Sequence, residues 1–488
     1  MNKPIADLHC HPAMKPFGKS FMRRYTTGEN NKNIHEENSI WHQQRPKLFR
    51  KVLNVLLTLT KWRQSDCQTL LEGNNRVIMA SLYPLEKGMI SNKRVGDLKF
   101  FDRVLRNLVK GVSMRRIRHL QKMPDYYADL NAEYDFYKQL HNKRFLINGV
   151  RKRYKMIGKA EDLELEDENC INVLMSIEGA HVFNCGLQLE GQPVADWAEV
   201  QKNIKEVKNW DYRPIFVTLA HHFYNELCGF AKSFEGGVAD IMQQNADPEV
   251  GMTTAGYAVI KTMLKNTAEK EGESNRILVD VKHMNVKSRY EYYAFLKKEY
   301  PDENIPIIVS HGAINGKLDP KTKKVKSLGF NAADINFFYE ELKIIQQSKG
   351  IFGLQLDERR IYDAKLKNEV FEHAEKKMTK YGKKRLRKGA YYIWRQIEKI
   401  GDYLDQEGLS AWDVQALGTD YDGIINPLNG WWTSRELKDL GPYLTHHASD
   451  FLKTHRGQTL KDFNKLSAEE IVEKFMSTNA IEFIKRNF

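Results

Sequence analysis

Two histidines separated by one residue end the first apolar stretch of the chain, Ile5–His11, which reads Ile-Ala-Asp-Leu-His-Cys-His. Because side chains alternate between the two faces of a strand, Asp7, His9 and His11 are expected to share one face. Neutral imidazole nitrogens are good ligands for zinc-type ions. The pattern therefore indicates half of a metal site, although so short a motif also fits a pair of surface histidines.

Five later apolar stretches also end near a side chain that can bind a metal ion or move a proton. These side chains are Glu178, His221, His283, His311 and Asp420. Enzymes built on a barrel of parallel strands carry their chemistry at the C-terminal ends of those strands. Histidines distributed at random would not gather there, so the strand ends are expected to meet in one site.

The residue types favour a site for two metal ions. His9 and His11 are predicted to hold one ion, and His283 and His311 the other. Glu178 has two carboxylate oxygens and can bridge the ions, which lie ~3.5–4 Å apart in such sites. The predicted cofactors are therefore two divalent metal ions. Such ions lower the pKa of a trapped water molecule and polarise a carbonyl or phosphoryl oxygen of the substrate.

Further assignments concern the reaction itself. Asp420 is the predicted catalytic base, which accepts the proton of the water and passes it to the leaving group. His221, or its neighbour His222, is expected to donate a hydrogen bond to the developing oxyanion, which makes His221 a catalytic and a substrate-binding candidate. His222 and Asp422 are candidate substrate-binding residues, and a supporting role in a loop fits both equally well.

Eight short apolar stretches could supply the strands that position these residues. They are Ile5–His11, Arg76–Tyr83, Ile171–His181, Pro214–His222, Ile277–His283, Ile305–His311, Ile351–Leu356 and Val414–Gly423. Nearly continuous apolar strands, most of them separated by helix-like segments, are typical of parallel strands buried on both faces. The sequence therefore predicts an α/β fold, a (β/α)8 TIM barrel.

The length leaves room for more than the barrel. With 488 residues, the chain is expected to form a single barrel domain over residues 1–488, with large helical insertions at about 15–75, 90–165 and 360–410. The net charge of +13 is concentrated in helix-like parts of these insertions. Such charge runs are usually solvated helix faces, and no nucleic-acid-binding motif accompanies them, so we expect no nucleic-acid partner.

The location of the protein is also predicted from composition. No apolar run approaches the ~20 residues that span a bilayer, and the N-terminus lacks a signal-peptide pattern, so a cytoplasmic protein is expected. The five cysteines are widely spaced and form no Cys-x-x-Cys pair, which indicates reduced thiols rather than a disulfide framework.

Five motifs together resemble those of a known family. They are Ser176–His181, Val217–His221, Leu278–His283, Val309–His311 and Gly418–Gly423, and Phe475–Asn479 follows them near the C-terminus. In this order they are similar to the motif series of the membrane dipeptidase (renal dipeptidase) family, a branch of the metal-dependent amidohydrolase superfamily. The resemblance skips the three insertions.

The resemblance implies a (β/α)8 barrel, a binuclear zinc site, hydrolysis of a dipeptide-like amide and a homodimer. The positions that match the family's metal ligands are His9, Glu178, His283 and His311. His221 matches the substrate-contacting histidine, and Asp420 matches the acid after strand eight.

The chain departs from the family pattern at two places. The family usually has His-x-Asp on the first strand, where this chain has His9-Cys10-His11. The arginine that binds the dipeptide carboxylate is also missing, because the corresponding region reads Lys326–Asn331. Lys326, Arg359 or Arg360 could replace it, since an unpaired substrate carboxylate would cost binding free energy.

Two other functions fit the same sequence. One is a metal-dependent phosphoesterase of the same superfamily, which the first-strand motif and the basic insertions favour. The other is a non-catalytic barrel scaffold that binds an anionic partner through its basic helices. An intact set of ligands argues against the scaffold, so a zinc-dependent hydrolase of a small amide is the leading prediction.

Overall fold

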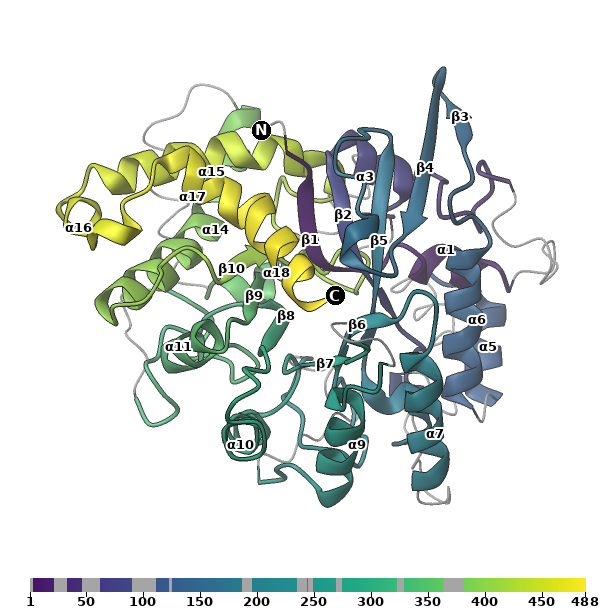
Figure 1. The fold of residues 1–488 in the computed structure, drawn as a ribbon. Coiled ribbons are helices and arrows are strands. Elements are labelled where there is room, and N and C mark those ends of the chain that lie inside the picture. The colour runs from purple at the N-terminus through teal and green to yellow at the C-terminus, as the bar shows by residue number, and fades with distance from the viewer. Residues whose placement is uncertain are drawn as a thin grey trace.

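The computed structural model describes residues 3–21, 33–45, 62–89, 111–122, 125–186, 195–234, 244, 249–268, 274–322, 329–363 and 381–488. Within these residues, parallel strands close into a barrel (Figure 1). Its strands are β1 (Ile5–Cys10), β2 (Asn75–Leu82), β5 (Cys170–Glu178), β6 (Pro214–Thr218), β7 (Leu278–Asp280), β8 (Ile308–Gly312), β9 (Ile351–Leu354) and β10 (Gln415–Leu417). Each predicted stretch overlaps one of them, which confirms the (β/α)8 barrel.

Barrel closure depends on two strand pairings between distant parts of the chain. β10 returns to β1, where Leu417 lies opposite Asp7. β2 pairs with β5 over six consecutive positions, from Val77 opposite Asn172 to Leu82 opposite Ile177. All residues of β2 and β5 are buried, as expected for strands that are covered by side chains on one face and by helices on the other.

Two buried aspartates join the strands from inside the barrel. Asp7 on β1 accepts hydrogen bonds from the backbone N–H and the hydroxyl of Thr419, at 2.9 and 2.6 Å. Asp280 on β7 accepts from the hydroxyls of Thr218 and Ser310, both at 2.6 Å. A buried carboxylate is tolerated when its oxygens are hydrogen-bonded, so these contacts fix the strand ends that carry the candidate site.

Helices surround the barrel and follow its strands (Figure 1). They are α1 (Met14–Lys19), α3 (Cys67–Glu72), α5 (Met114–Lys122), α6 (Tyr126–Lys138), α7 (Trp197–Lys208), α9 (Thr254–Leu264), α10 (Val286–Glu299), α11 (Tyr339–Gln347), α12 (Glu358–Ile361), α14 (Tyr381–Gln406), α15 (Leu437–Leu452), α16 (His455–Gln458), α17 (Ala468–Glu473) and α18 (Asn479–Asn487). A π-helical turn, Lys474–Thr478, joins the last two. In the described part of the chain, no helix is both long and apolar enough to cross a membrane.

The second insertion is not wholly helical, contrary to expectation. It contains α5 and α6, but also an antiparallel hairpin of β3 (Phe145–Ile147) and β4 (Val150–Met156). β4 pairs with the first half of β5, opposite Cys170–Val173, and β6 pairs with the second half. The hairpin therefore forms because it covers backbone groups of β5 that β6 does not reach. Residues 46–61, 90–110 and 364–380 of the three insertions lie outside the described residues.

Candidate metal centre

All predicted ligands and the predicted base lie together at the C-terminal end of the barrel. Glu178 is the last residue of β5, and His311 lies on β8. His9 lies on β1, the loops after β1, β6, β7 and β10 supply the remaining side chains, and every member is at least nine-tenths buried. The members are His9, His11, Glu178, His221, His283, His311 and Asp420. The barrel thus brings together residues that are more than 400 positions apart in the sequence.

Glu178 occupies the middle of this cluster. Its Oε2 lies 3.0 Å from Nε2 of His11. Its Oε1 faces four other imidazoles, whose Nε2 atoms lie at 3.4 Å (His9), 3.5 Å (His221), 3.4 Å (His283) and 3.5 Å (His311). The carboxylate therefore presents one oxygen to His11 and the other to His9, His221, His283 and His311, and both oxygens of a bridging ligand must face donors in this way.

Asp420 lies against the same imidazoles from the β10 side. Its Oδ1 is 3.8 Å from Nε2 of His9 and 3.7 Å from Nε2 of His11. Gln355 donates a hydrogen bond to its Oδ2 at 2.7 Å. Oδ1 is buried and has no hydrogen-bond partner among the described residues. One carboxylate oxygen is therefore positioned by Gln355 and the other is directed at the histidine pair.

The spacing of the donors fits metal ions. Four ligands at ~2.0–2.1 Å from a tetrahedral ion lie about 3.3 Å from one another. The contacts of Glu178 with the imidazoles, 3.0 to 3.5 Å, are close to this value, and Nε2 of His9 lies 3.1 Å from Nε2 of His11. Imidazole and carboxylate donors suit zinc and neighbouring transition metals.

The described residues of the centre form three groups of possible metal ligands. Within each group, the ligand atoms lie within 4.8 Å of one another. The groups are His9–His11–Asp420, His9–Glu178–His311 and His221–His222–His283. The first agrees with the predicted pairing of His9 with His11. The predicted pairing of His283 with His311 is not among the groups and stays a prediction.

Several ligand histidines are oriented by a hydrogen bond to the ring nitrogen that faces away from Glu178. Nδ1 of His11 lies 3.1 Å from the carbonyl oxygen of Ser81. Nδ1 of His311 lies 2.9 Å from the hydroxyl of Ser310. Such contacts fix the tautomer and leave Nε2 to bind an ion, as is usual for metal-bound histidine.

The backbone adopts strained conformations at two members of the centre. His283 has φ +68° and Asp420 has φ +59°, both in the left-handed region. Such conformations cost about 1–3 kcal/mol each in residues other than glycine and concentrate at functional sites. Glycine is required directly after Glu178, because Gly179 has φ +95° and a Cβ there would lie 2.3 Å from Nδ1 of His181.

The two carboxyl groups of the centre differ in acidity. Burial opposes the charge of Glu178, yet the surrounding imidazoles, His221 first among them, hold its pKa well below the usual range. Burial and the charge of Glu178 hold the pKa of Asp420 well above its usual range. Glu178 is therefore suited to remain an ionised ligand, whereas Asp420 is suited to accept a proton.

The imidazoles also differ from one another. Burial lowers the pKa of His283 and of His311 well below the usual range. Burial also opposes the charge of His221, but the carboxylates of Glu178 and Glu86 outweigh it and raise the pKa of His221 to about 10. The centre therefore contains neutral imidazoles, which have a lone pair for a metal ion, next to one that is held by two acids.

Glu86 is a residue that sequence reasoning missed. Its Oε2 lies 2.7 Å from Nδ1 of His221, and its Oε1 accepts the backbone N–H of Phe223 at 3.1 Å. It follows the second strand by four residues, so a search for acids shortly after each strand would have found it.

Asp422, a predicted substrate-binding residue, is engaged elsewhere. Its Oδ1 accepts a hydrogen bond from Lys15 at 2.6 Å. Its Oδ2 accepts from the backbone N–H of Gln64 and from the hydroxyl of Ser65, at 3.0 and 2.7 Å. Both oxygens are thus used to hold the segment before α3. These contacts support the loop role, and binding of substrate by Asp422 stays a prediction.

Three cations were considered as substitutes for the arginine that binds the substrate carboxylate in the family, and their surroundings differ. Lys326 lies outside the described residues. Arg359 is paired with Asp357 at 2.6 Å. Arg360 is buried and is an electrostatic neighbour of Lys282, which sequence reasoning missed. Lys282 is 1% exposed, and its ammonium group has no hydrogen-bond partner among the described residues.

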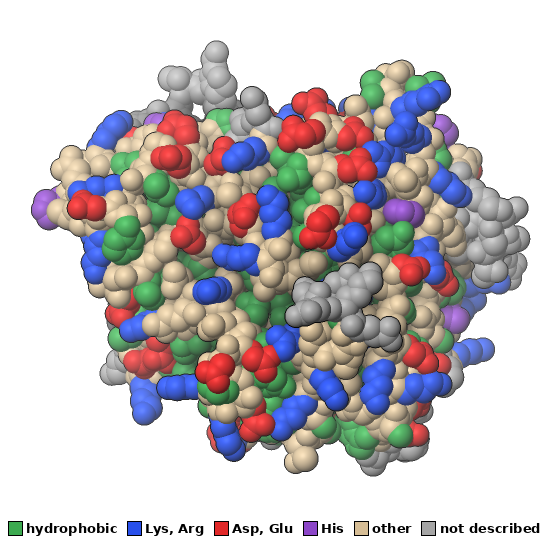
Figure 2. All heavy atoms as spheres, viewed as in Figure 1, with side chains coloured by type: hydrophobic (Ala, Val, Ile, Leu, Met, Phe, Trp, Pro, Cys, Tyr) green, Lys and Arg blue, Asp and Glu red, His purple; other side chains and the backbone are tan. Residues whose placement is uncertain are grey.

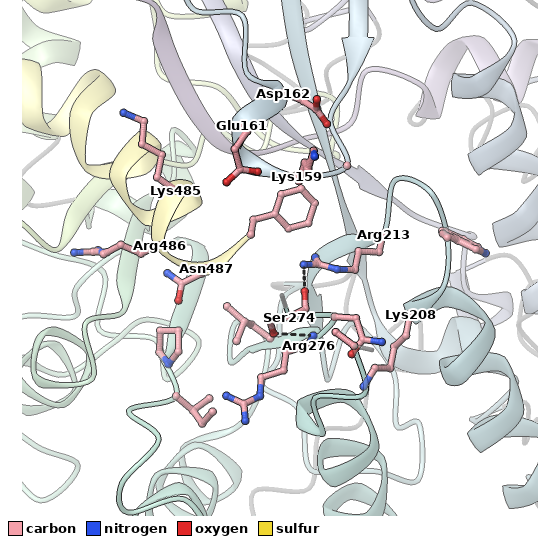
Figure 3. A pocket seen from close by; sticks show the side chains of 18 of the residues that line it. Lys159, Glu161, Asp162, Lys208, Arg213, Ser274, Arg276, Lys485, Arg486 and Asn487 are labelled. Atoms are coloured by element: carbon pink, nitrogen blue, oxygen red, sulfur yellow. Dashed lines mark hydrogen bonds between the residues drawn. The ribbon is translucent and has the colours of Figure 1, made fainter. Parts of the chain in front are cut away.

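A large cavity of about 1180 Å³ lies at the opposite end of the barrel, near the N-terminal ends of β6, β7 and β8 (Figure 3). Three of its basic side chains bind within the protein. Arg213 donates to the carbonyl oxygen of Ser274, and Arg276 pairs with Glu303. Lys208 donates to backbone carbonyl groups, including that of Thr262 at 3.0 Å. This cavity therefore lacks the convergent ligand set of the centre.

The face of the molecule in Figure 2 gives no support to an anion-binding surface over the described residues. On the face that Figure 2 shows, basic and acidic side chains are interspersed over the described residues. A surface that binds an anionic partner needs clustered positive charge. The scaffold function has no observation in its favour on this face.

No protein-family model and no curated protein matches the sequence. Among solved structures, the chain is similar to a metallo-peptidase from Rhodobacter sphaeroides liganded with a phosphinate mimic of the dipeptide L-Ala-D-Ala, with 12% identity over 99% of each chain and a TM-score of 0.48. It is also similar to the probable dipeptidase PvdM from Pseudomonas aeruginosa, with 11% identity over 87% of this chain and 90% of that chain and a TM-score of 0.47. A third neighbour is dipeptidase AC, a metallo-peptidase, with 12% identity over 90% of this chain and 95% of that chain and a TM-score of 0.42.

Proposed function

We propose that this protein is a metal-dependent hydrolase of a small, dipeptide-like amide and that it uses two divalent ions, zinc in the first place. One observation carries the proposal: a buried carboxylate, Glu178, is surrounded by five imidazoles at 3.0 to 3.5 Å. So many imidazoles around one acid serve no packing purpose, because buried polar groups are costly unless they bind something. The proposed ligands are His9, His11, Glu178, His283 and His311.

Bound divalent ions would lower the pKa of a water molecule and polarise the oxygen of the scissile bond. The chain's own residues would supply the proton transfers. Asp420, whose pKa burial and Glu178 raise, accepts the proton of the water and passes it to the leaving amine. Gln355 keeps one oxygen of Asp420 in place for this role.

The neighbourhood of the centre favours a substrate with a negative charge. Lys282 and Arg360 are buried cations near each other, and the nearest acids that act on Lys282 belong to the centre and its support. Two divalent ions would add more positive charge, which an anionic group of the substrate would offset. A carboxylate of a dipeptide-like substrate meets this requirement without the family's arginine.

A phosphoester is the second candidate substrate, because the same two cations would bind a phosphate. Both substrates are tested by one experiment on the full chain loaded with zinc. A panel of dipeptides, with L- and D-residues at the C-terminal position, is assayed beside a panel of phosphomonoesters. Turnover of a dipeptide that a chelator abolishes and zinc restores would support the proposal.

Turnover of phosphoesters alone would replace the amide with the second candidate. A protein that binds no metal ion and turns over neither panel would contradict the proposed hydrolase. The homodimer, the cytoplasmic location and the lack of a nucleic-acid partner stay predictions.

A further inference from the structure

We infer that the large cavity at the N-terminal end of the barrel binds a small organic molecule that carries a phosphate group, through Arg213 and the neighbouring charge of Lys208. This site is separate from the metal centre, which lies at the other end of the barrel. The inference does not depend on the proposed function, because none of the residues that line the cavity belongs to the centre.

Arg213 is the residue of this cavity that most needs a ligand. It lies directly before β6 and is 8% exposed. Its Nη2 donates to the backbone carbonyl of Ser274, whereas its Nη1 is buried and has no hydrogen-bond partner among the described residues. Figure 3 shows the guanidinium group of Arg213 directed at Ser274 among the lining side chains. A buried donor without an acceptor costs free energy, which an anion in the cavity would recover.

The described acids do not offset the charges of Arg213 and Lys208. Lys208 is 5% exposed and donates to the neutral backbone carbonyls of Thr262 and Met263, at 3.0 and 3.3 Å. Burial lowers the pKa of Arg213 to about 10. Burial and the charges of nearby cations, Arg276 first among them, lower the pKa of Lys208 to about 8. A carboxylate beside either group would act in the opposite direction, so the two cations are uncompensated.

A phosphate group fits this charge better than a carboxylate does. The other charged side chains of the cavity are four basic and four acidic ones, which are exposed or half-buried and balance one another. The lining therefore has an excess of two positive charges, those of the buried Arg213 and Lys208. A phosphate monoester carries close to two negative charges at pH 7. Its oxygens also match the planar fork of donors on a guanidinium group.

The size and the aromatic residues of the cavity favour an organic phosphate over the free ion. The volume of about 1180 Å³ exceeds the ~300–1,000 Å³ of most ligand pockets. The ring of Phe488 lies over the guanidinium of Arg213, with 4.4 Å between its centroid and Cζ. This stacking restrains the guanidinium, whose N–H groups lie at the edge of its plane. Trp210 also lines the cavity, so an organic group would have apolar surface to contact.

The test measures phosphate binding to the full chain by titration calorimetry. Wild-type protein and variants are titrated with inorganic phosphate and with glycerol 3-phosphate at constant ionic strength. Arg153→Gln is the matched control for Arg213→Gln, because Arg153 is 7% exposed but is paired with Glu164 and Asp167. Glu178→Ala disrupts the metal centre and so separates binding in the cavity from binding to metal ions. Circular dichroism checks that each variant is folded.

Wild type, Arg153→Gln and Glu178→Ala are expected to bind both phosphates with the same affinity as one another, and the ester more tightly than the free ion. Arg213→Gln should bind both about 10–100-fold more weakly, because a charge-assisted hydrogen bond is lost. Arg276→Gln removes a less buried positive charge from the same cavity and should weaken binding about 3-fold. It tests the inference if Arg213→Gln does not fold.

Three results would overturn the inference. One is an unchanged affinity in Arg213→Gln, or in Arg276→Gln if only that variant folds. Another is phosphate binding that Glu178→Ala abolishes, because the anion would then lie at the metal centre. The third is tighter binding of inorganic phosphate than of the ester, which would exclude an organic ligand.

Discussion

At the scale of single residues, the centre depends on one acid that meets imidazoles from several strands. Glu178 is 3% exposed; its Oε2 contacts His11, and its Oε1 faces the other imidazoles, His283 among them. Among the described residues, Glu178 is the one acid that forms ion pairs with both His11 and His283. Removing it should separate the ligands into two incomplete sets.

Glu178→Ala is therefore expected to lose at least one ion and to lower kcat by more than about 100-fold, while the barrel remains folded. Metal analysis and circular dichroism measure the two effects. Glu226→Ala serves as the control, because this buried glutamate contacts the backbone of Ala195 rather than the centre. A Glu178→Ala protein with two ions and full turnover would rule out the bridge.

Asp420 and Asp422 provide a matched pair for the catalytic base. Asp420→Asn retains an acceptor for Gln355 but cannot take a proton, so kcat should fall by about 10²–10⁴-fold with both ions retained. Asp422→Asn should instead lower the free energy of unfolding, because it loses its charge opposite Lys15. Steady-state kinetics and urea unfolding separate the outcomes. The base assignment fails if Asp420→Asn keeps its kcat.

At the scale of elements, buried acids at strand and helix ends determine how the segments join. Asp7 connects β1 to Thr419, two residues after β10, where the barrel closes. Asp66 caps α3 and accepts from the backbone N–H of Thr69 at 3.0 Å. Each acid is 1% exposed, so the loss of one partner or of one proton should change stability measurably.

Thr419→Val tests the closure of the barrel. The variant has nearly the same shape but removes the hydroxyl that donates to Asp7 at 2.6 Å. The free energy of unfolding in urea should fall by about 1–3 kcal/mol, because a buried carboxylate oxygen loses its donor. Thr459→Val, at an exposed position of α16's C-terminal end, should change it by less than about 0.5 kcal/mol. Equal changes in the two variants would mean that the contact between Thr419 and Asp7 does not stabilise the closure of the barrel between β1 and β10.

Asp66 predicts a pH dependence of stability. Burial raises the pKa of its carboxyl from 3.8 to about 7, despite hydrogen bonds from Thr69 that lower it. Since the folded protein holds this proton more tightly than the unfolded chain, the contribution is present below about pH 4 and is lost as the pH rises through about 7. Asp66→Asn keeps an oxygen that can cap α3, but it has no carboxyl group that could bind a proton.

The free energy of unfolding of Asp66→Asn should therefore increase relative to that of wild type between pH 5 and pH 8, because only wild type loses this contribution. Urea unfolding at the two pH values measures the change. Thr253→Ala removes the cap of α9 without removing an ionisable group, so its cost of about 1 kcal/mol should be the same at both. A constant difference for Asp66→Asn would show that its carboxyl does not hold the proton.

At the scale of the whole molecule, metal binding and folding should be linked. The ligands come from β1, β5, β8 and the loops after β6, β7 and β10, so they meet only in the closed barrel. The C-terminal part adds to this closure, because Ser477 donates to the carbonyl oxygen of Pro4, just before β1, at 2.7 Å. An ion that binds the folded chain alone stabilises it by mass action.

Zinc at 100 times its dissociation constant should add about 2.7 kcal/mol per site and raise Tm by several degrees. Differential scanning fluorimetry with zinc and with a chelator measures the shift, which should be smaller in Glu178→Ala. Magnesium at the same concentration is the control, since it prefers oxygen ligands. The same Tm with zinc and with chelator would contradict a metal centre in the folded state.

The sequence by itself determined the barrel and most of the centre. Burial of a strand needs only a short apolar run, and a ligand such as His311 stands directly at its end, so both are local patterns. The helical expectation was wrong for Val150–Met156, because pairing with β3 on one side and β5 on the other decided its conformation. Only the tertiary structure decided that Glu86 meets His221, that Ser233 meets His222 and that Lys282 is buried near the centre. The paths of the loops set these contacts, and loop paths depend on hydrogen bonds and packing between residues far apart in the chain.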